Sequence, residues 1–257
     1  MTRGALSWCS VGTINPSHRL GDDAPHPESH RRILALVHPG ESVLDVGCST
    51  GRLAAQLKAK QCFVVGTEID PEAAAIARQR NNMDVFLVTS ERSGLPESYR
   101  NAFDVVIAAD VIEHTPDPYR FVTDLLRYVR PGGRFIVSIP NVAHWTVRLD
   151  LLLGRWEYRP SGLLDASHLR FFTFASAKRL LWECGLTLVS ITFTTRPMLR
   201  ASRLECLDRL HWRARQFREV TLAALVAMAP WSLVRLRPTL FAWQFIIEAR
   251  KSRPCGD

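Results

Sequence analysis

Long hydrophobic runs and closely spaced cysteines are what this 257-residue chain has least of. The first twenty residues contain no long apolar stretch, so we expect no cleaved secretory signal. The apolar run at 222–231 is shorter than the roughly 20 residues that a membrane-spanning helix needs, and Pro230 interrupts it. The six cysteines are too far apart for a Cys-x-x-Cys metal or redox pair, which predicts a reducing, cytoplasmic location without a disulfide framework.

Positive charge is present, but it is not concentrated. The formal net charge is +8. A nucleic-acid-binding surface would gather basic residues into one cluster with exposed aromatic residues, whereas here they are spread along the chain apart from one C-terminal region. We therefore expect no nucleic-acid partner. With 47% hydrophobic residues, the chain can bury the core of a full domain.

A glycine turn between two short strands carries the strongest functional signal. Asp45 lies near the end of a β-branched strand, and Gly47 and Gly51 follow before a helix begins. The next strand ends in a second acid, Glu68. Glycines let the backbone approach a ligand closely, and a carboxylate at this place can accept hydrogen bonds from two vicinal ribose hydroxyls. The pattern therefore predicts a nucleoside site.

The turn lacks the Gly-x-Gly-x-x-Gly spacing of a dinucleotide site, because it reads Gly-Cys-Ser-Thr-Gly-Arg over 47–52. A nicotinamide-dependent reductase would need that spacing. An acid inside the strand end, Asp45, is unfavourable beside a polyanion but suits a cationic ligand that carries a free amino group. S-adenosylmethionine is such a ligand.

Three ordered motifs resemble those of the class I S-adenosylmethionine-dependent methyltransferases. The glycine turn resembles motif I, with Ser49 where the family usually has its middle glycine. Residues 103–114 (FDVVIAADVIEH) resemble the fourth strand and following loop, in the branch that includes the ubiquinone-biosynthesis-type enzymes. Residues 126–141 resemble the next helix, turn and strand. The resemblance covers roughly residues 30 to 195.

The alternation of strand and helix patterns, together with the resemblance, predicts an α/β fold. We expect a doubly wound, Rossmann-like sheet of seven strands, mostly parallel, with a final antiparallel strand within 240–249 between the fifth and sixth. Residues 1–27 are expected to be a poorly ordered lead-in, and 28–257 the methyltransferase domain. Insertions at 141–174 and 197–238 would form the acceptor side. The other expected elements are helices at 29–37, 52–60, 71–80, 117–129 and 175–184, and strands at 43–47, 62–67, 84–88, 103–109, 133–139 and 186–194.

The resemblance implies the cofactor contacts. It assigns ordering of the loop near the methionine amino group to Asp45 and the ribose hydroxyls to Glu68. The adenine contact stays open between two residues, because the family usually has Gly-Asp after the third strand where this chain has Thr-Ser-Glu at 89–91. The full predicted cofactor set is Asp45, Gly47, Ser49, Gly51, Glu68, Ser90, Glu91 and Asp110.

Two histidines are candidates for a catalytic base. His114 follows the fourth strand, where the resemblance places the activated methyl group, and it could instead only pack against the cofactor. His168 lies in Asp165-x-x-His-x-Arg-Phe-Phe, which resembles the active-site cover of glycan-pathway methyltransferases; it could instead bond structurally to Asp165 or to a backbone carbonyl. We favour His168 because of its place in this cover-like insert. An imidazole with a pKa near ~6.5 accepts a hydroxyl proton at neutral pH. The predicted acceptor-binding residues are Asn141, His144, Asp165 and Arg170.

The sequence thus predicts methyl transfer from S-adenosylmethionine to a small-molecule or glycan-type acceptor, at a hydroxyl oxygen, by in-line displacement with a histidine base. The alternative is a cofactor-binding partner or regulatory protein without transferase activity, and the candidate bases favour the enzyme. Nucleobase amino methylation is disfavoured because the (Asn/Asp)-Pro-Pro-aromatic loop is missing at 109–112. No metal-ligand cluster stands out, so no metal is predicted and a magnesium-dependent mechanism is disfavoured. The carboxylates of Asp110 and Asp165 are of the type that binds magnesium, so this mechanism is not excluded.

The C-terminal insertion has two interpretations. Its arginines lie off an apolar helical stripe, so it is either a helical cover of the sheet with solvated arginines, which we favour, or a basic amphipathic helix that rests on an anionic membrane surface. The second interpretation would place the protein peripherally at the inner face of the membrane. The arginines concerned are Arg203, Arg209, Arg213 and Arg218.

Overall fold

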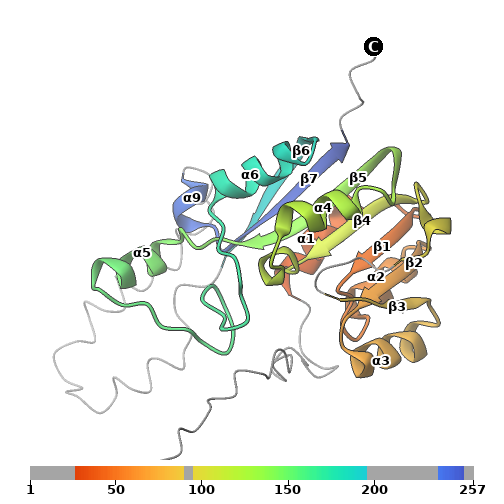
Figure 1. Cartoon of the computed structure of the whole chain (residues 1–257), viewed down its shortest axis with the longest axis horizontal. Helices are drawn as coiled ribbons and strands as arrows, with labels where there is room; N and C mark the ends of the chain where they lie inside the picture. Colours follow the sequence, from red (N-terminus) through yellow and green to blue (C-terminus); the bar gives the residue numbers. More distant parts are fainter. Residues whose placement is uncertain (1–26, 90–94, 196–236, 252–257) are drawn as a thin grey trace, which may run out of the picture.

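The computed structural model describes residues 27–89, 95–195 and 237–251. Its elements alternate between strand and helix for most of the chain, as Figure 1 shows. In order they are α1 (Glu28–Leu36), β1 (Ser42–Val46), α2 (Arg52–Ala59), β2 (Phe63–Glu68), α3 (Pro71–Asn81), β3 (Val85–Leu87), the short 3-10 helix η2 (Glu97–Tyr99), β4 (Phe103–Ala109), the 3-10 helix η3 (Ile112–His114), α4 (Pro118–Leu125), β5 (Val129–Pro140), α5 (Trp145–Leu152), α6 (Phe174–Glu183), β6 (Leu186–Thr194), α9 (Pro238–Phe241) and β7 (Gln244–Lys251).

The strands form one seven-stranded sheet in the order β3-β2-β1-β4-β5-β7-β6. Strands β1 to β5 pair in parallel. Strand β7 lies between β5 and β6 and is antiparallel to both. This topology confirms the predicted fold class, including the place of the last strand.

Helices cover both faces of the sheet and enclose two hydrophobic cores (Figure 1). Helices α1, α2 and α3 pack on one face, and α4 and α6 pack on the other. Successive side chains of a strand point to opposite faces. Along β4, Val105 and Ile107 therefore enter the core under α1, α2 and α3, whereas Val106 and Ala108 enter the core under α4 and α6. A strand buried on both faces needs a continuous apolar run, which is the pattern that the sequence has there.

The predicted boundaries are wrong by four residues in two places: where α4 ends and β5 begins, at Val129 rather than residue 133, and where β7 begins. The helix expected at 117–129 ends at Leu125, because Val129 already pairs with Phe103 of β4 and Tyr128 is buried with its hydroxyl donating to the Leu95 carbonyl. The last strand begins at Gln244 rather than near residue 240, because Pro238 starts the one-turn helix α9. In both places contacts with distant parts of the chain, or a proline, override the local pattern.

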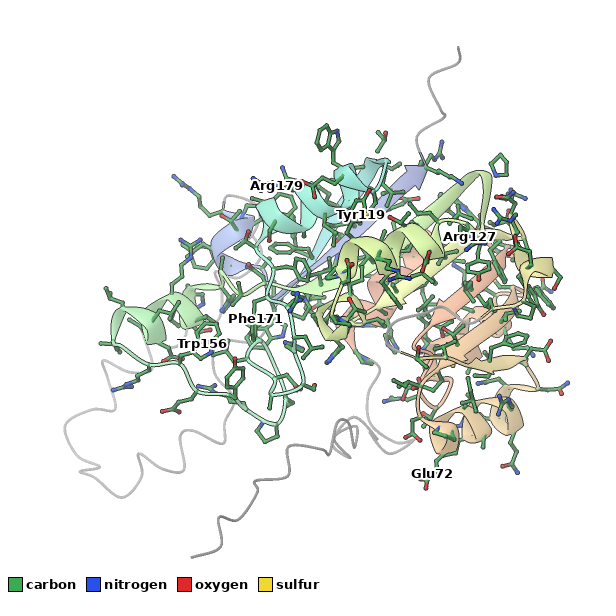
Figure 2. The ribbon with its side chains drawn as sticks, in the orientation of Figure 1. Glu72, Tyr119, Arg127, Trp156, Phe171 and Arg179 are labelled. Carbon is green, nitrogen blue, oxygen red and sulfur yellow. The ribbon has the colours of Figure 1, made fainter. Side chains whose placement is uncertain are left out.

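The first predicted insertion extends beyond the carboxyl end of β5, as Figure 1 shows. It contains α5 and a long loop, in which the ring of Trp156 packs edge-on against Phe171 at 5.3 Å (Figure 2). The predicted lead-in and the second insertion, 197–238, lie outside the described residues except for 27, 237 and 238. None of the described helices is long and apolar enough to cross a membrane.

Candidate active site

The glycine turn, residues 47–51, has the backbone conformation that its sequence predicts. Gly47 and Gly51 have φ angles of +67° and +79°. A Cβ atom at Gly47 would lie 2.7 Å from a methyl carbon of Val111, so only glycine fits between the turn and the residues that follow β4. Ser49 also has a positive φ, +48°, which costs a residue with a side chain about 1 kcal/mol. This explains why the family usually has glycine at this position.

Glu68 is held by three backbone amides at the end of β2. Its Oε2 accepts from the Ser49 amide at 2.7 Å, and its Oε1 accepts from the amides of Ile69 and Asp70 at 2.8 and 3.0 Å. The residue is buried, with 6% of its surface exposed. A carboxylate has roughly four acceptor positions, so these bonds fix its orientation and leave it capacity for a ribose hydroxyl.

Asp45 is buried directly beside this carboxylate. Among the described residues its Oδ2 has no hydrogen-bond partner. Burial, and then the charge of Glu68, raise the pKa of Asp45 to about 7. A buried carboxylate with an unpartnered oxygen is stabilised by a cationic donor, so its chemistry fits the amino group of S-adenosylmethionine.

Asp110 directly follows β4 and has a left-handed backbone conformation, with φ +55°. Its Oδ1 accepts from the Ser138 hydroxyl of β5 at 2.7 Å and from the Gln244 amide of β7 at 2.9 Å. Sequence reasoning missed Ser138 and Gln244, because only the strand order brings β5 and β7 beside Asp110. The predicted adenine contacts, Ser90 and Glu91, lie outside the described residues.

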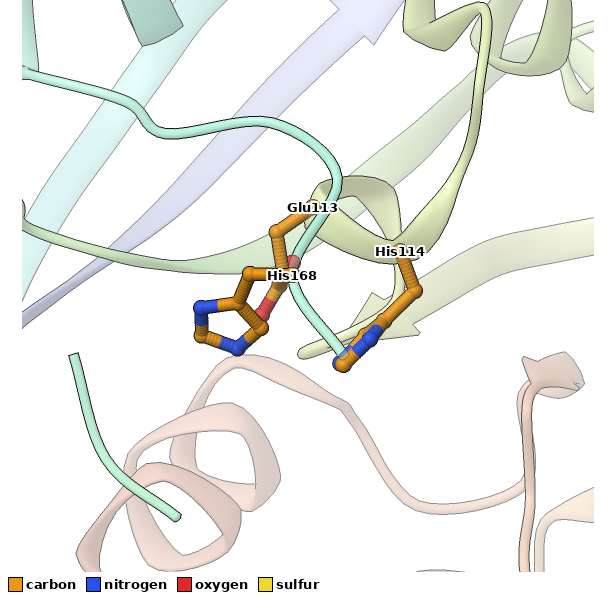
Figure 3. A group of neighbouring side chains, drawn as sticks. All are labelled: Glu113, His114 and His168. Atoms are coloured by element: carbon orange, nitrogen blue, oxygen red, sulfur yellow. The ribbon is translucent and has the colours of Figure 1, made fainter. Parts of the chain in front are cut away.

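Glu113, His114 and His168 meet beyond the end of β4, and we call them the Glu-His-His group. Figure 3 shows the three side chains pointing toward one another, two from η3 and one from the loop at 165–172, called here the cover loop. One carboxylate oxygen and one ring nitrogen from each histidine all lie within 4.8 Å of one another. The two imidazole centroids are 4.8 Å apart. Residues distant in sequence thus form a set of metal-ligand type that the sequence analysis did not find.

Backbone hydrogen bonds hold the cover loop in this place. The amides of Leu169 and Arg170 both donate to the Glu113 carbonyl, at 2.8 and 2.9 Å. The Nδ1 atom of His114 lies 3.1 Å from the Ser167 carbonyl oxygen. A carbonyl can only accept, so this bond assigns the proton to Nδ1 and leaves Nε2 as the basic atom of the neutral ring.

Glu113 is a candidate site residue to which the sequence analysis assigned no role. It is 1% exposed, and neither carboxylate oxygen has a hydrogen-bond partner among the described residues. Burial first, and then the charges of Asp110 and Asp165, raise the pKa of Glu113 well above its usual range. Its position beside His114 after the fourth strand was the only signal available in the sequence.

Two of the predicted acceptor residues stabilise the first insertion. Asn141 is fully buried, and its amide donates to the carbonyls of Ala242 at 2.8 Å and Thr239 at 3.2 Å. His144 caps α5, and its Nδ1 lies 2.8 Å from the Thr146 hydroxyl. These bonds give both side chains a structural role, and their contact with an acceptor stays a prediction.

The other two acceptor candidates belong to the cover loop. Asp165 is buried, and its Oδ1 accepts from the amide and hydroxyl of Ser167 at 2.8 and 2.6 Å. Arg170 is exposed and donates to the carbonyls of Leu169 and Pro116. Asp165 therefore shapes the loop that carries His168, while Arg170 joins that loop to the segment before α4.

Comparisons with known proteins agree with this arrangement. A sequence model described as a methyltransferase domain matches residues 23–191, more than half of the chain. The chain is 30% identical over 174 residues to a ubiquinone biosynthesis O-methyltransferase of Thiobacillus denitrificans, covering 65% of this chain and 73% of that protein. It is 29% identical over 200 residues to the protein of the same description from Cereibacter sphaeroides, covering 70% and 76%.

Solved structures agree on the fold. A SAM-dependent methyltransferase from Archaeoglobus fulgidus superposes with a TM-score of 0.55 at 16% identity, covering 86% of this chain and 90% of that one. At this identity the likeness supports the fold alone. The sequence matches and the geometry of the glycine turn, Asp45 and Glu68 lead to the same conclusion: the chain belongs to the methyltransferase domain family and is a class I S-adenosylmethionine-dependent methyltransferase.

Proposed function

We propose that this methyltransferase acts on a hydroxyl oxygen of a small-molecule or glycan-type acceptor. The observation that carries the proposal is the pair of imidazoles beyond β4, because an oxygen nucleophile gains from losing its proton whereas a neutral amine needs little help. The two relatives above, whose names describe O-methyltransferases, support oxygen as the acceptor atom.

Bound S-adenosylmethionine would supply a methyl group on a sulfonium, which is a good leaving group. As the acceptor oxygen bonds to the methyl carbon, the carbon–sulfur bond breaks and its electron pair stays on sulfur. The glycine turn and Glu68 would fix the cofactor, so that acceptor, carbon and sulfur lie in line. Positioning of this kind can contribute about 7 kcal/mol or more to lowering the barrier.

The hydroxyl proton would pass to the histidine pair. His114 is half-buried, and its bond to Ser167 leaves Nε2 able to accept a proton. His168, which the sequence analysis favoured, is 8% exposed and lies beside the Glu113 carboxylate. We propose that the base is one of these two imidazoles, and single variants of each will assign it.

A direct test measures release of S-adenosylhomocysteine from the full chain with S-adenosylmethionine and simple probes. Catechol, phenol and glucose offer hydroxyls, and benzylamine offers an amine. We expect turnover with at least one hydroxyl probe and methylation at its oxygen, identified by mass spectrometry. Turnover with the amine alone would contradict the proposed acceptor chemistry.

Contact with a membrane is a further prediction that the described residues do not cover. The arginines concerned belong to 197–238, of which only residues 237 and 238 are described. A cytoplasmic location, peripheral at the inner face of the membrane, therefore stays part of the proposal and is tested with vesicles below.

A further inference from the structure

The Glu113 carboxylate is buried with no hydrogen-bond partner in the part of the chain that the structure describes, which is costly for a charged group. Both of its oxygens are inaccessible to solvent and lack hydrogen bonds among the described residues. Buried carboxylates in proteins are normally bonded to donors or neutralised by a cation. The carboxylates of Asp110 and Asp165 add negative charge nearby. This place in the fold therefore favours a positive charge.

The neighbours of Glu113 are ligands of the kind that bind transition metals. His114 and His168 each bring a ring nitrogen to within 4.8 Å of a Glu113 oxygen and of each other. His114 also donates its other ring nitrogen to the Ser167 carbonyl, at 3.1 Å. Metal-binding histidines almost always make such a second bond, because it fixes the tautomer and the orientation of the ring.

We propose that Glu113, His114 and His168 form a binding site for a divalent transition-metal cation of the Zn²⁺ class. Two imidazoles and one carboxylate suit Zn²⁺ and related ions, whereas Mg²⁺ prefers oxygen ligands only. A zinc ion about 2.0–2.2 Å from each ligand atom brings those atoms closer together than 4.8 Å, so the side chains would rotate slightly inward on binding. Three protein ligands leave a fourth position open, as in catalytic zinc sites.

The open position gives the cation a role in methyl transfer, and this role rests on the proposed hydroxyl acceptor. An acceptor oxygen bound to a divalent cation loses its proton more readily, because the positive charge stabilises the alkoxide or phenoxide. The proton would then leave to solvent, and the two imidazoles would act as ligands while the cation is bound. Binding of the cation itself does not depend on the acceptor.

The test uses the full chain after treatment with a chelator. Calorimetric titration with Zn²⁺ should show one site per chain, and Mg²⁺ should bind much more weakly. Glu113→Gln keeps the shape of the side chain and removes its charge, so it should weaken Zn²⁺ binding by at least about 100-fold, as should His168→Asn. The matched control, His38→Asn, changes an exposed histidine outside the group and should bind Zn²⁺ like the wild type.

A second measurement uses only wild-type protein and so does not depend on how the variants fold. Co²⁺ in place of Zn²⁺ should give visible absorption bands typical of mixed nitrogen and oxygen ligands. Lack of these bands, or equal Zn²⁺ affinity in wild type and Glu113→Gln, overturns the site. Zinc binding without turnover on any hydroxyl probe would instead contradict the proposed function. If the chelator-treated protein binds no Zn²⁺ and still turns over at the full rate, the proposed cation site is wrong and the proposed function stands.

Discussion

Glu68 and Glu113 are both buried at the same edge of the sheet, but their surroundings are opposite. Glu68 accepts three backbone amide hydrogen bonds, whereas the Glu113 oxygens accept none among the described residues. The first carboxylate is fixed before a ligand binds, and it resembles a preformed recognition site. The second receives no donor from the described part of its own fold, which suits a site that is completed by a cation or by proton transfer. The two halves of the active site thus use burial for different purposes.

The largest expected effect is on the Glu-His-His group. His168→Ala should lower turnover by roughly 10²–10⁴-fold and leave S-adenosylmethionine affinity unchanged, because the imidazole acts on the acceptor side. Steady-state kinetics with the best hydroxyl probe, together with cofactor titration, measure both quantities. His38→Ala is the control. Turnover near the wild-type rate would refute a role for His168, and a comparable loss only in His114→Ala would move the base to His114.

The environment of Asp45, beside Glu68 in the predicted cofactor site, can be tested by the pH dependence of stability. Its pKa is about 7 in the folded protein and about 3.8 when unfolded, so the folded state binds more protons between these values. The contribution of Asp45 to the free energy of unfolding should therefore be greatest below pH 4 and fall as pH rises to about 7, by at most about 4 kcal/mol. Denaturant unfolding of ligand-free wild type and Asp45→Asn measures this contribution. The difference between the two proteins should grow with pH, and parallel curves would contradict the assigned environment of Asp45.

Glu68→Ala tests whether the amide-bound carboxylate contributes to cofactor binding. It should weaken binding of S-adenosylmethionine by roughly 1.5–3 kcal/mol, since a charge-assisted bond to ribose is lost. Calorimetry measures the change. Glu97→Ala removes an exposed glutamate that pairs with surface arginines, and it should bind the cofactor like the wild type. If both variants bind equally well, Glu68 serves only to hold the turn.

The smallest effects are expected in the basic C-terminal stretch. If its arginines contact anionic lipid, each should contribute about 1 kcal/mol, and the protein should sediment with anionic vesicles at low salt. Added salt should release it, because charges more than ~8 Å apart are screened at physiological ionic strength. Reversal of Arg203 and Arg209 to glutamate should abolish sedimentation and spare cofactor binding. Wild-type protein that stays in the supernatant at low salt would support a solvated cover of the sheet.

Much of the fold could be predicted because the signals are local. The strand expected at 103–109 is β4 to the residue, since a strand with both faces buried needs an uninterrupted apolar run. The same holds for the glycine turn, whose positive φ angles require small residues. The end of α4 could not be predicted, because it depends on Val129 pairing with Phe103 of β4, which lies before α4 in the chain.

The candidate site divides in the same way. Asp45 and Glu68 follow from strand ends that the sequence marks clearly. The Glu-His-His group forms only because backbone bonds from Leu169 and Arg170 bring the cover loop to the Glu113 carbonyl. Nothing in the spacing of Glu113 and His168 indicates that contact, so the sequence alone could not predict this set of candidate metal ligands. Local patterns therefore predict the cofactor residues Asp45 and Glu68 better than the Glu-His-His group on the acceptor side.

Calorimetric titration of the wild-type chain with S-adenosylmethionine, S-adenosylhomocysteine and NAD shows which nucleoside the glycine turn binds. The glycine turn lies beside an Asp45 oxygen that has no partner within residues 27–89, 95–195 and 237–251, and beside an amide-bound Glu68, which suits a nucleoside that carries an amino group. We expect saturable heat with S-adenosylmethionine or its demethylated product and none with NAD. Heat with NAD, and none with either sulfur ligand, would contradict the account.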